Sequence, residues 1–258
     1  VIISKTYPFK IDENKLLRIL LLKGIKIYSL PKWCESELNC LPVLLIQEEN
    51  LIDSKLFSNN KDIEFRIKRF GDIVLGIILL FLSLPILIIS CLFIWINDRG
   101  PIFYSQTREG LFGEKIKIIK LRTMKTNAEE NGPQWATNND KRITFVGKIL
   151  RKTRIDELPQ IITVINGQMS LIGPRPERPE FNSELNDLIP NYYLRNYIKP
   201  GLSGWAQVNY PYGASLEDAK KKLSYDIYYI RNFSFWIDLL ILFKTARVVF
   251  SGIGWSPK

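Results

Sequence analysis

The feature that most constrains this chain is a continuous apolar segment. From Ile73 to Ile96 there are 24 residues without a charged side chain, and 18 of them are Leu, Ile, Phe or Val. Apolar runs of about 18 residues or more usually mark membrane segments, whereas a buried core helix of this length is normally amphipathic. On an insertion scale the run gains roughly 5 to 11 kcal/mol, against about 3 kcal/mol for an internal proline. The segment is therefore predicted to enter a membrane.

The middle and the flanks of the run favour a turn inside the membrane over a simple crossing. Pro85 should kink the helix, and the Ser83 hydroxyl is expected to satisfy a freed carbonyl. A spanning helix normally has its Lys and Arg excess on one side, yet here Lys61, Arg66, Lys68 and Arg69 precede the run and Arg99, Arg108 and Lys115 follow it. We expect a re-entrant helix-break-helix over 73–96. A straight span stays open, because 24 residues at about 1.5 Å each also cross a ~30 Å hydrocarbon core.

The charge balance points to a polyanionic partner. With 36 Lys and Arg against 26 Asp and Glu, the net charge is +10, which fits nucleic acid, anionic lipid or a phosphorylated substrate. The sequence has no histidine, so Ser-His-Asp and Cys-His relays, His-ligated zinc and the usual neutral-pH general base are excluded. Its three cysteines form no CxxC pair or disulfide framework, which suits a reducing compartment.

The rest of the chain predicts an α+β fold. Residues 1–60 are expected to form a small mixed module with a helix over 14–23, a strand over 25–30 and no catalytic pattern. Residues 102–106 and 115–122 resemble two strands of a hairpin, and 126–140 a loop. Helical spacing over 141–153 predicts an amphipathic helix with a basic face. A second apolar helix over 234–250 either lies in the headgroup layer or packs on the domain.

Three clusters are candidates for chemistry: Arg154 to Pro159, Ser170 to Pro176, and Lys199 to Trp205. In the first, Asp156 precedes an apolar helical pattern, and we expect it at or near the N-cap, where the helix dipole and free N–H groups favour a carboxylate or a phosphate. An ordinary N-cap with an acidic first turn is the simpler interpretation of the pair Asp156 and Glu157 taken alone. In the second cluster, prolines fix the backbone around Arg175, whose guanidinium suits bidentate phosphate contact.

The clusters occur in an order that resembles the bacterial sugar transferases, the monotopic polyprenyl-phosphate phosphoglycosyl transferases that initiate exopolysaccharide or O-antigen synthesis. The resemblance runs from Arg66 to the C-terminus, about three quarters of the chain. The matching pieces are Lys68-Arg69, Gly100 to Phe103, Gln106 to Arg108, Lys120 to Met124, Asp156 to Pro159, Met169 to Pro176 and Lys199 to Asn209.

The resemblance implies a two-step transfer of sugar-1-phosphate from a UDP-sugar to polyprenyl (undecaprenyl) phosphate. Asp156 would be the nucleophile that carries the phosphosugar, and Glu157 its partner, which either places Mg²⁺ or assists proton movement. Both carboxylates are expected at the Mg²⁺ ion. The cations expected to bind substrate phosphates are Arg175, Arg154, Arg122, Lys120 and Arg108. Two departures from the family pattern stand out: Leu84 occupies the place before the membrane proline where Ser is common, and Leu121 and Thr123 flank Arg122 where Phe and Ser are usual.

The resemblance also implies an arrangement and a location. Residues 1–60 would be the truncated end of an N-terminal regulatory module, and 61–258 a catalytic domain on the cytoplasmic face of the bacterial inner membrane, in contact with membrane lipid. No nucleic-acid partner is expected. The alternatives are a membrane protein that binds nucleic acid through the basic helix over 141–153, and a non-catalytic scaffold that docks anionic lipid. The sequence leaves open the sugar, the polysaccharide and homo-oligomerisation.

Overall fold

The computed structural model describes residues 2–3, 11–46, 62–128, 140–210, 213 and 215–251. Within these ranges the chain is a mixture of helices and three two-stranded sheets, as expected of an α+β fold. The N-terminal elements are β1 (Ile2–Ile3), α1 (Ile11–Leu22), β2 (Tyr28–Ser29), α2 (Leu30–Trp33), the π-helical turn η1 (Cys34–Leu38) and the 3₁₀ turn η2 (Val43–Leu45).

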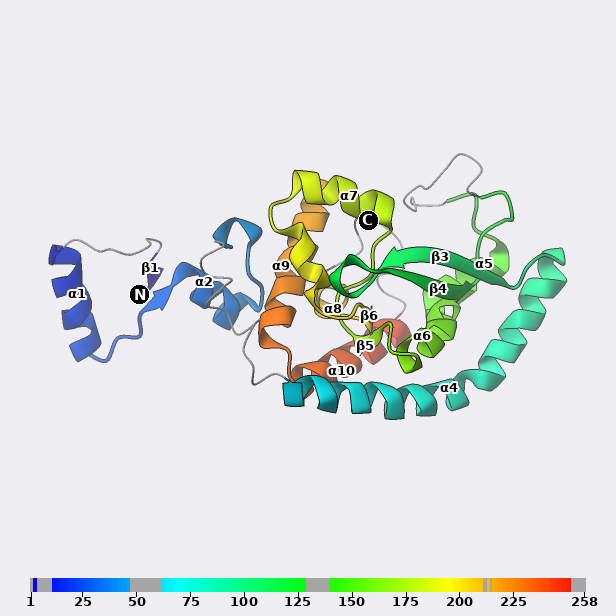
Figure 1. Ribbon diagram of the computed structural model, residues 1–258, viewed down its shortest axis with the longest axis horizontal. Coiled ribbons are helices and arrows are strands. Elements are labelled where there is room, and N and C mark those ends of the chain that lie inside the picture. The colour runs from blue at the N-terminus through cyan, green and yellow to red at the C-terminus, as the bar shows by residue number, and fades with distance from the viewer. Residues whose placement is uncertain are drawn as a thin grey trace.

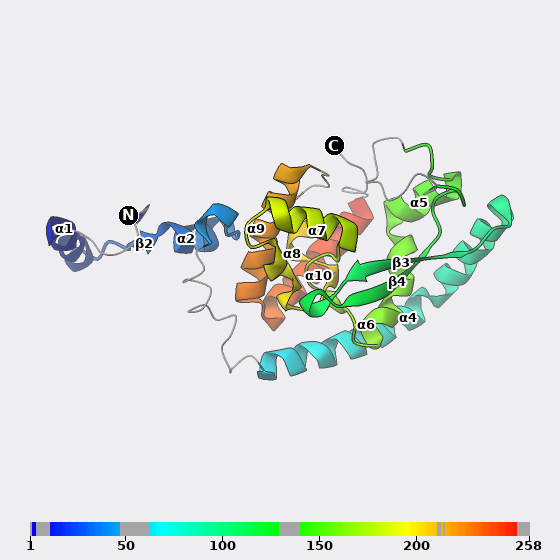
Figure 2. The ribbon, with the colours of Figure 1, turned by 45° about the horizontal axis from the view of Figure 1, so that its top comes forward.

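The remaining elements form one body that follows the long helix α4 (Figures 1 and 2). They are α4 (Asp62–Asp98), β3 (Phe103–Glu109), η5 (Leu111–Gly113), β4 (Lys115–Leu121), α5 (Phe145–Thr153), η6 (Ile155–Gln160), α6 (Ile161–Ile165), β5 (Ser170–Ile172), α7 (Pro179–Leu188), η7 (Tyr192–Tyr197), β6 (Gly201–Ser203), α8 (Trp205–Asn209), α9 (Leu216–Asn232) and α10 (Phe235–Ser251).

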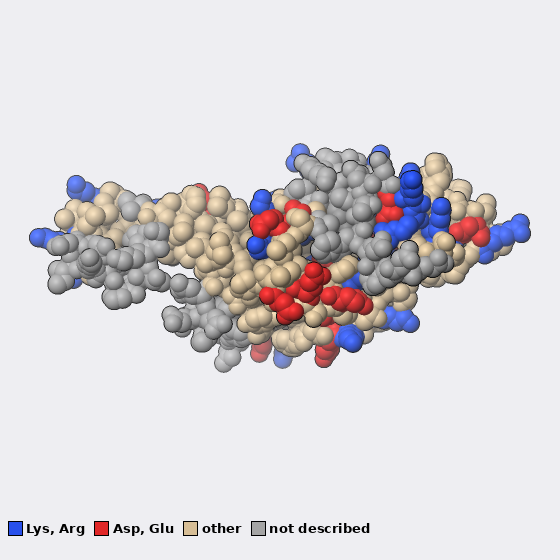
Figure 3. Space-filling view, turned by 90° about the horizontal axis from the view of Figure 1, so that it is seen from above, with Lys and Arg blue, Asp and Glu red and all other residues tan. Residues whose placement is uncertain are grey.

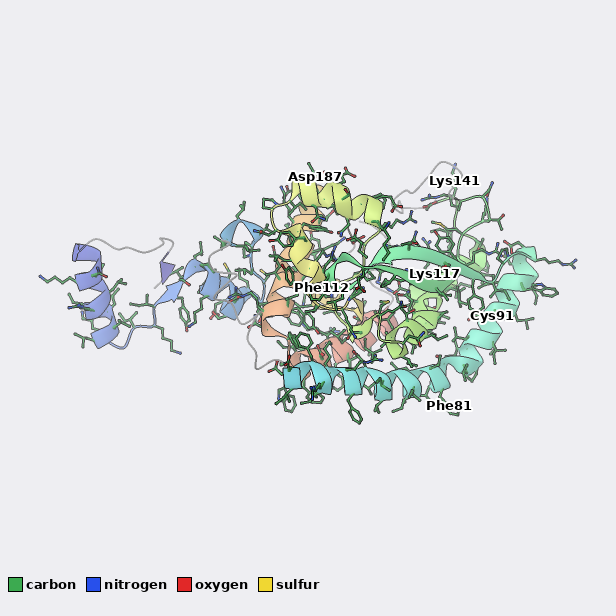
Figure 4. The ribbon with its side chains drawn as sticks, viewed as in Figure 1. Phe81, Cys91, Phe112, Lys117, Lys141 and Asp187 are labelled. Carbon is green, nitrogen blue, oxygen red and sulfur yellow. The ribbon has the colours of Figure 1, made fainter. Side chains whose placement is uncertain are left out.

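Helix α4 contains the apolar run and is longer than the run itself. Within the described residues it is the one helix long and apolar enough to cross a membrane. It bends between Phe81 and Cys91 (Figure 4) and continues through Pro85 without interruption, so the expected break is a bend in a continuous helix. Proline removes only one N–H donor from a helix, the donor to the residue four positions earlier. The carbonyl that Pro85 leaves without a donor is therefore that of Phe81. The Ser83 hydroxyl donates instead to Leu80 O at 3.0 Å, so the prediction that Ser83 satisfies the freed carbonyl is wrong.

The start of α4 is fixed to the fold by charged side chains. Arg69 donates to the carbonyl oxygens of Val164 and Ile165 at 2.6 Å each, where the end of α6 presents unpaired carbonyls to a cation. Asp72 is buried and accepts from the N–H of Leu171 at 2.9 Å. These contacts join α4 to α6 and β5.

The end of α4 is fixed to the same body. Asp98 pairs with Arg122, the residue that follows β4. One turn earlier, Ile94 packs in a small core cluster with Leu121 and Leu150. Both ends of α4 therefore contact one fold.

The β-hairpin forms as predicted, with strands somewhat longer than expected on one side. Strands β3 and β4 pair antiparallel from Phe103 opposite Leu121 to Glu109 opposite Lys115. Strands β5 and β6 pair in parallel, and Gly201 lies where a Cβ would meet the Gly173 nitrogen at 2.0 Å. Part of the cluster Lys199 to Trp205 thus serves close backbone packing.

The main core lies between β4, β5, β6, α9 and α10, and it includes Ile118, Met169, Tyr229 and Ile241. Helix α10 packs on the domain, one of the two arrangements expected for it, since Ile241 is buried in the core, while Trp236 is exposed. The basic helix predicted over 141–153 begins at Phe145, with Thr144 as N-cap accepting from the Gly147 N–H at 2.9 Å.

Residues 33–46 pack against the body formed by the later elements, while α1 extends away from it (Figure 1). The helix predicted over 14–23 is confirmed as α1, and the predicted strand shrinks to β2. Leu41, Val43 and Ile46 share a core cluster with Tyr192 and Ile227. In addition, the Leu41 N–H donates to Ser224 O at 3.0 Å. A domain boundary at residue 60 falls in 47–61, outside the described residues.

This packing predicts that Leu41→Ala destabilises the whole fold and that Leu44→Ala does not. Leu41 is 3% exposed and Leu44 94%. A buried Leu→Ala change costs about 2 to 5 kcal/mol, and an exposed one about 0.5 kcal/mol or less. Thermal unfolding of the detergent-solubilised full chain measures both. Equal melting temperatures for the two variants would show that residues 33–46 do not pack on the core.

Candidate active site

The acidic pair lies in a 3₁₀ turn between two helices. Arg154 ends α5 with a left-handed backbone (φ 59°) and leads into η6, which carries Asp156 and Glu157 in its first turn. The expectation that Asp156 caps a regular α-helix is therefore wrong: α6 begins only at Ile161. The positive φ of Arg154 turns the chain so that both carboxylates are buried, at 8% and 7% exposure.

Three cations surround the carboxylate of Glu157. Arg175 Nη2 lies 2.6 Å from Oε1, Lys120 Nζ 3.5 Å from Oε1, and Arg154 Nη1 3.4 Å from Oε2. Burial alone would raise the pKa of Glu157, but Arg175, Lys120 and Arg154 outweigh it and hold the pKa well below its usual range. Glu157 is therefore ionised and fixed in place.

Asp156 has a different environment. Its Oδ1 is buried and has no hydrogen-bond partner among the described residues. Burial, followed by the adjacent Glu157 carboxylate, raises the pKa of Asp156 to about 6, although Lys120 opposes this. Burial also lowers the pKa of Lys120 to about 8. A buried polar atom without a partner is unusual and marks a candidate functional site.

The pair opens into a cleft of about 480 Å³, with walls formed by β3, β4 and α5 on one side and η7, α8 and α9 on the other. Among the described residues, eleven lysines and arginines line this cleft against four acids. In the view from above, basic side chains gather right of the middle with a few acidic ones beside them, and a separate acidic group lies nearer the middle (Figure 3). An excess of cations around a concave site fits a substrate with several phosphate charges.

Two of the predicted phosphate-binding arginines line the cleft but hold protein groups. Arg108 donates to Pro176 O at 3.2 Å and to Gln106 Oε1 at 2.6 Å. Arg122 pairs with Asp98, and a Cβ on Gly100 would meet its Nη1 at 2.6 Å. The structure thus brings Lys120, Arg154 and Arg175 together at Glu157, and gives Arg108 and Arg122 structural contacts.

Other residues of the cleft were not singled out from the sequence. Arg151 lines the cleft, and its Nε donates to Thr123 Oγ1 at 2.8 Å. The sequence showed Arg151 only as one member of the basic face of α5. Arg195 and Asp226 are buried beside the cleft and joined at 3.0 Å, and no motif marked either of them.

The acidic residues fit a magnesium ion only in combination with substrate. Among the described residues, no group of three or more His, Cys, Asp or Glu gathers. Glu157 is already neutralised by cations, whereas Asp156 Oδ1 is without a partner. Mg²⁺ at phosphoryl-transfer sites is commonly held by one or two carboxylates together with substrate phosphates. The donor set is adequate for an ion of that kind, which the acidic pair would hold together with substrate phosphates.

The sequence profile of the bacterial sugar transferase family matches residues 63–252. Over 188 residues the chain is 44% identical to a UDP-N-acetylgalactosamine-undecaprenyl-phosphate N-acetylgalactosaminephosphotransferase of Aeromonas hydrophila, covering 73% of this chain and 44% of that protein. Over 230 residues it is 38% identical to the UDP-glucose:undecaprenyl-phosphate glucose-1-phosphate transferase of Escherichia coli K12, covering 88% and 48%.

A transferase of the latter name from Caulobacter vibrioides is 41% identical over 183 residues, which make up 69% of this chain and 68% of that protein. The chain spans about half the length of the Aeromonas and Escherichia relatives. Because the family profile covers most of the chain, including the whole of α4 after Asp62, the hairpin and the acidic pair, the chain belongs to the bacterial sugar transferase family.

Proposed function

We propose that the protein transfers a sugar-1-phosphate from a UDP-sugar to polyprenyl phosphate, with undecaprenyl phosphate as the acceptor. The observation that carries this proposal is the pairing of an unpartnered, buried carboxylate oxygen on Asp156 with a cleft rich in cations. The names of the relatives describe this same exchange, with glucose or N-acetylgalactosamine as the sugar. The sugar used by this chain is left to experiment.

In the first step, Asp156 Oδ1 attacks the β-phosphorus of the UDP-sugar. A bond forms between the carboxylate oxygen and phosphorus while the bond from phosphorus to the bridging oxygen breaks, and UMP leaves with that electron pair. In the second step, an oxygen of the polyprenyl phosphate attacks the same phosphorus and releases the Asp156 carboxylate. Carboxylate nucleophiles are an established route to covalent phosphoryl intermediates.

The surrounding cations supply electrostatic stabilisation. Phosphoryl transfer depends mainly on positioning and on neutralising the charge of the transferred group. Arg175, Lys120 and Arg154 are already gathered at Glu157, close to the nucleophile. We assign Glu157 the role of holding these cations in the correct place. Mg²⁺, when bound, would neutralise charge on the diphosphate.

We also propose that α4 is re-entrant, with both ends on the cytoplasmic face of the inner membrane. The contacts of Arg69 with α6 and of Asp98 with Arg122 support this, since they place both ends of α4 on one fold. Exposed apolar side chains elsewhere suit lipid contact: they include Phe145 on α5 and Phe235 and Phe243 on α10.

The nucleophile assignment predicts that Asp156→Asn abolishes turnover and leaves the fold intact, because the amide keeps the shape but cannot attack phosphorus. UMP release from a panel of UDP-sugars, with polyprenyl phosphate and Mg²⁺, should fall more than about a thousandfold. With the acceptor omitted, wild-type protein should retain label from a UDP-sugar carrying ³²P in its β-phosphate, and Asp156→Asn should not.

The matched control is Asp187→Asn, an exposed acid on α7 (Figure 4), which should retain normal turnover. An Asp156→Asn protein that keeps even a tenth of wild-type turnover would rule out the covalent role. Absence of UMP release from wild-type protein with every UDP-sugar in the panel would contradict the proposed function itself.

Arg175→Lys should lower kcat/KM for the nucleotide sugar by about tenfold or more, a loss of about 1.4 kcal/mol or more. Arg175 contacts both oxygens of Glu157, at 2.6 and 3.5 Å, and an ammonium cannot reproduce that fork. Steady-state kinetics measure the effect, with Arg66→Lys, at an exposed position on α4, as the control. Unchanged kinetics in Arg175→Lys would refute its assignment to the phosphate.

The topology predicts that cysteines introduced singly at Glu64 and Asn97 react with an impermeant thiol reagent only after cells are permeabilised. Both positions are exposed and lie near opposite ends of α4. The background replaces Cys34, Cys40 and Cys91. Labelling of one of the two from outside intact cells would show that α4 spans. Pro85→Leu should straighten the helix and shift part of the population toward that one-sided pattern.

A further inference from the structure

The segment Pro174–Glu177 carries the arginine that reaches Glu157, and it is fixed through its carbonyl groups. Pro174 and Pro176 have no N–H, so this segment cannot form a regular backbone ladder. Instead, each of its four carbonyls accepts a hydrogen bond. The donors are Gly201 N to Pro174 O at 2.8 Å, Arg195 Nη2 to Arg175 O at 2.8 Å, Arg108 Nη1 to Pro176 O at 3.2 Å, and Glu109 N to Glu177 O at 3.0 Å.

Arg195 is the donor to Arg175 itself, and it is buried at 6% exposure. Its guanidinium also bonds Asp226 Oδ2 at 3.0 Å and the hydroxyl of Tyr192, and it lies 3.7 Å from Glu177 Oε1. One planar group thereby ties η7, α9 and the Pro174–Glu177 segment together. Lysine has no such fork of donors and cannot make these contacts at the same time.

Burying this network costs free energy, because its charged and polar groups lose their contacts with water. Asp226 is 2% exposed and Tyr192 3% exposed, so two charges and a hydroxyl have been removed from water. Buried ion pairs are often no more stabilising than apolar residues of the same volume, and their best-attested use is to fix one arrangement. Here the arrangement fixed is the backbone of Arg175.

We infer that Arg195 is a positioning residue for the transfer reaction: it holds the backbone carbonyl of Arg175 so that the Arg175 guanidinium meets Glu157 and the donor phosphate. Asp226 and Tyr192 accept hydrogen bonds from the Arg195 guanidinium and so hold it in place. Tyr192 also belongs to the core cluster that includes Leu41 and Val43, so residues 33–46 pack directly behind this network. The inference rests on the proposed function, because it gives Arg175 a substrate phosphate to bind.

The test is a double-mutant cycle between Arg195 and Arg175. Arg195→Lys in the wild-type background should lower kcat/KM for the UDP-sugar by about tenfold or more, and in an Arg175→Ala background by less than about twofold. The second effect is small because the group that Arg195 positions is already missing. A residue that matters only for general stability would lower activity by the same factor in both backgrounds, and that result would overturn the inference.

The matched control is Arg231→Lys, since Arg231 is a half-buried arginine that pairs with Glu35 at 2.6 Å and does not line the cleft. It should leave kcat/KM unchanged in both backgrounds. Where Arg195→Lys fails to fold, Tyr192→Phe replaces it in the cycle, because the phenyl ring retains the packing and loses only the hydroxyl that accepts from Arg195. An equal loss for Tyr192→Phe in the two backgrounds would likewise overturn the inference.

Measuring the Kd for UDP in the same set of variants distinguishes failure of this inference from failure of the proposed function. If the wild type binds UDP but releases no UMP from any UDP-sugar, the proposed function fails while the coupling between Arg195 and Arg175 is still read from the Kd values. If Arg195→Lys changes the Kd for UDP less in the Arg175→Ala background than in the wild type, the positioning role is supported. If it changes the Kd by the same factor in both backgrounds, the positioning role is contradicted, whatever the outcome of the turnover assay.

Discussion

The site depends on one buried carboxylate, Glu157, and the three cations around it. A carboxylate at 7% exposure would lose its charge without partners. Arg175, Lys120 and Arg154 supply those partners and hold the pKa of Glu157 well below its usual range. The adjacent Asp156 receives no hydrogen bond on Oδ1, and its pKa moves in the opposite direction. One residue of the pair organises positive charge, and the other keeps an oxygen available for reaction.

The fold supplies these cations from three separate places. Lys120 comes from β4 of the hairpin, Arg154 from the left-handed residue that ends α5, and Arg175 from the proline-bracketed segment after β5. No single element carries more than one of them, so the site exists only when the hairpin, η6 and the β5–β6 pair are assembled. Long side chains from distant elements converge on Glu157 because its buried charge is stabilised only when all of them reach it.

Patterns that depend on local physics were predicted from the sequence, and long-range contacts were not. The apolar run indicated α4, the two strand-like stretches over 102–106 and 115–122 indicated the hairpin, and helical spacing indicated α5. The acidic pair was found from its motif. Its N-cap position was wrong, because the positive φ at Arg154 and the following 3₁₀ turn have no composition signal. Arg122 and Arg108 point to Asp98 and Pro176, partners set by tertiary packing. The Arg195 network and the packing of residues 33–46 depend on such contacts entirely.

Long-range contacts of the same kind join the two ends of α4 to the candidate site. Near its start, Arg69 holds the end of α6, the helix that directly follows η6 and its acidic pair. A Cβ on Gly76 would lie 3.2 Å from Ile165 Cγ1, so α4 and α6 approach closely there. At its far end, Asp98 pairs with Arg122, two residues beyond Lys120. Asp156 and Lys120 are therefore tied to opposite arms of one bent helix. The bend near Pro85 lies between these two points of attachment. Under the proposed function, the depth at which the exposed apolar face of α4 enters lipid would determine the height of Asp156 above the membrane, where a nucleotide sugar and a lipid phosphate would both reach it.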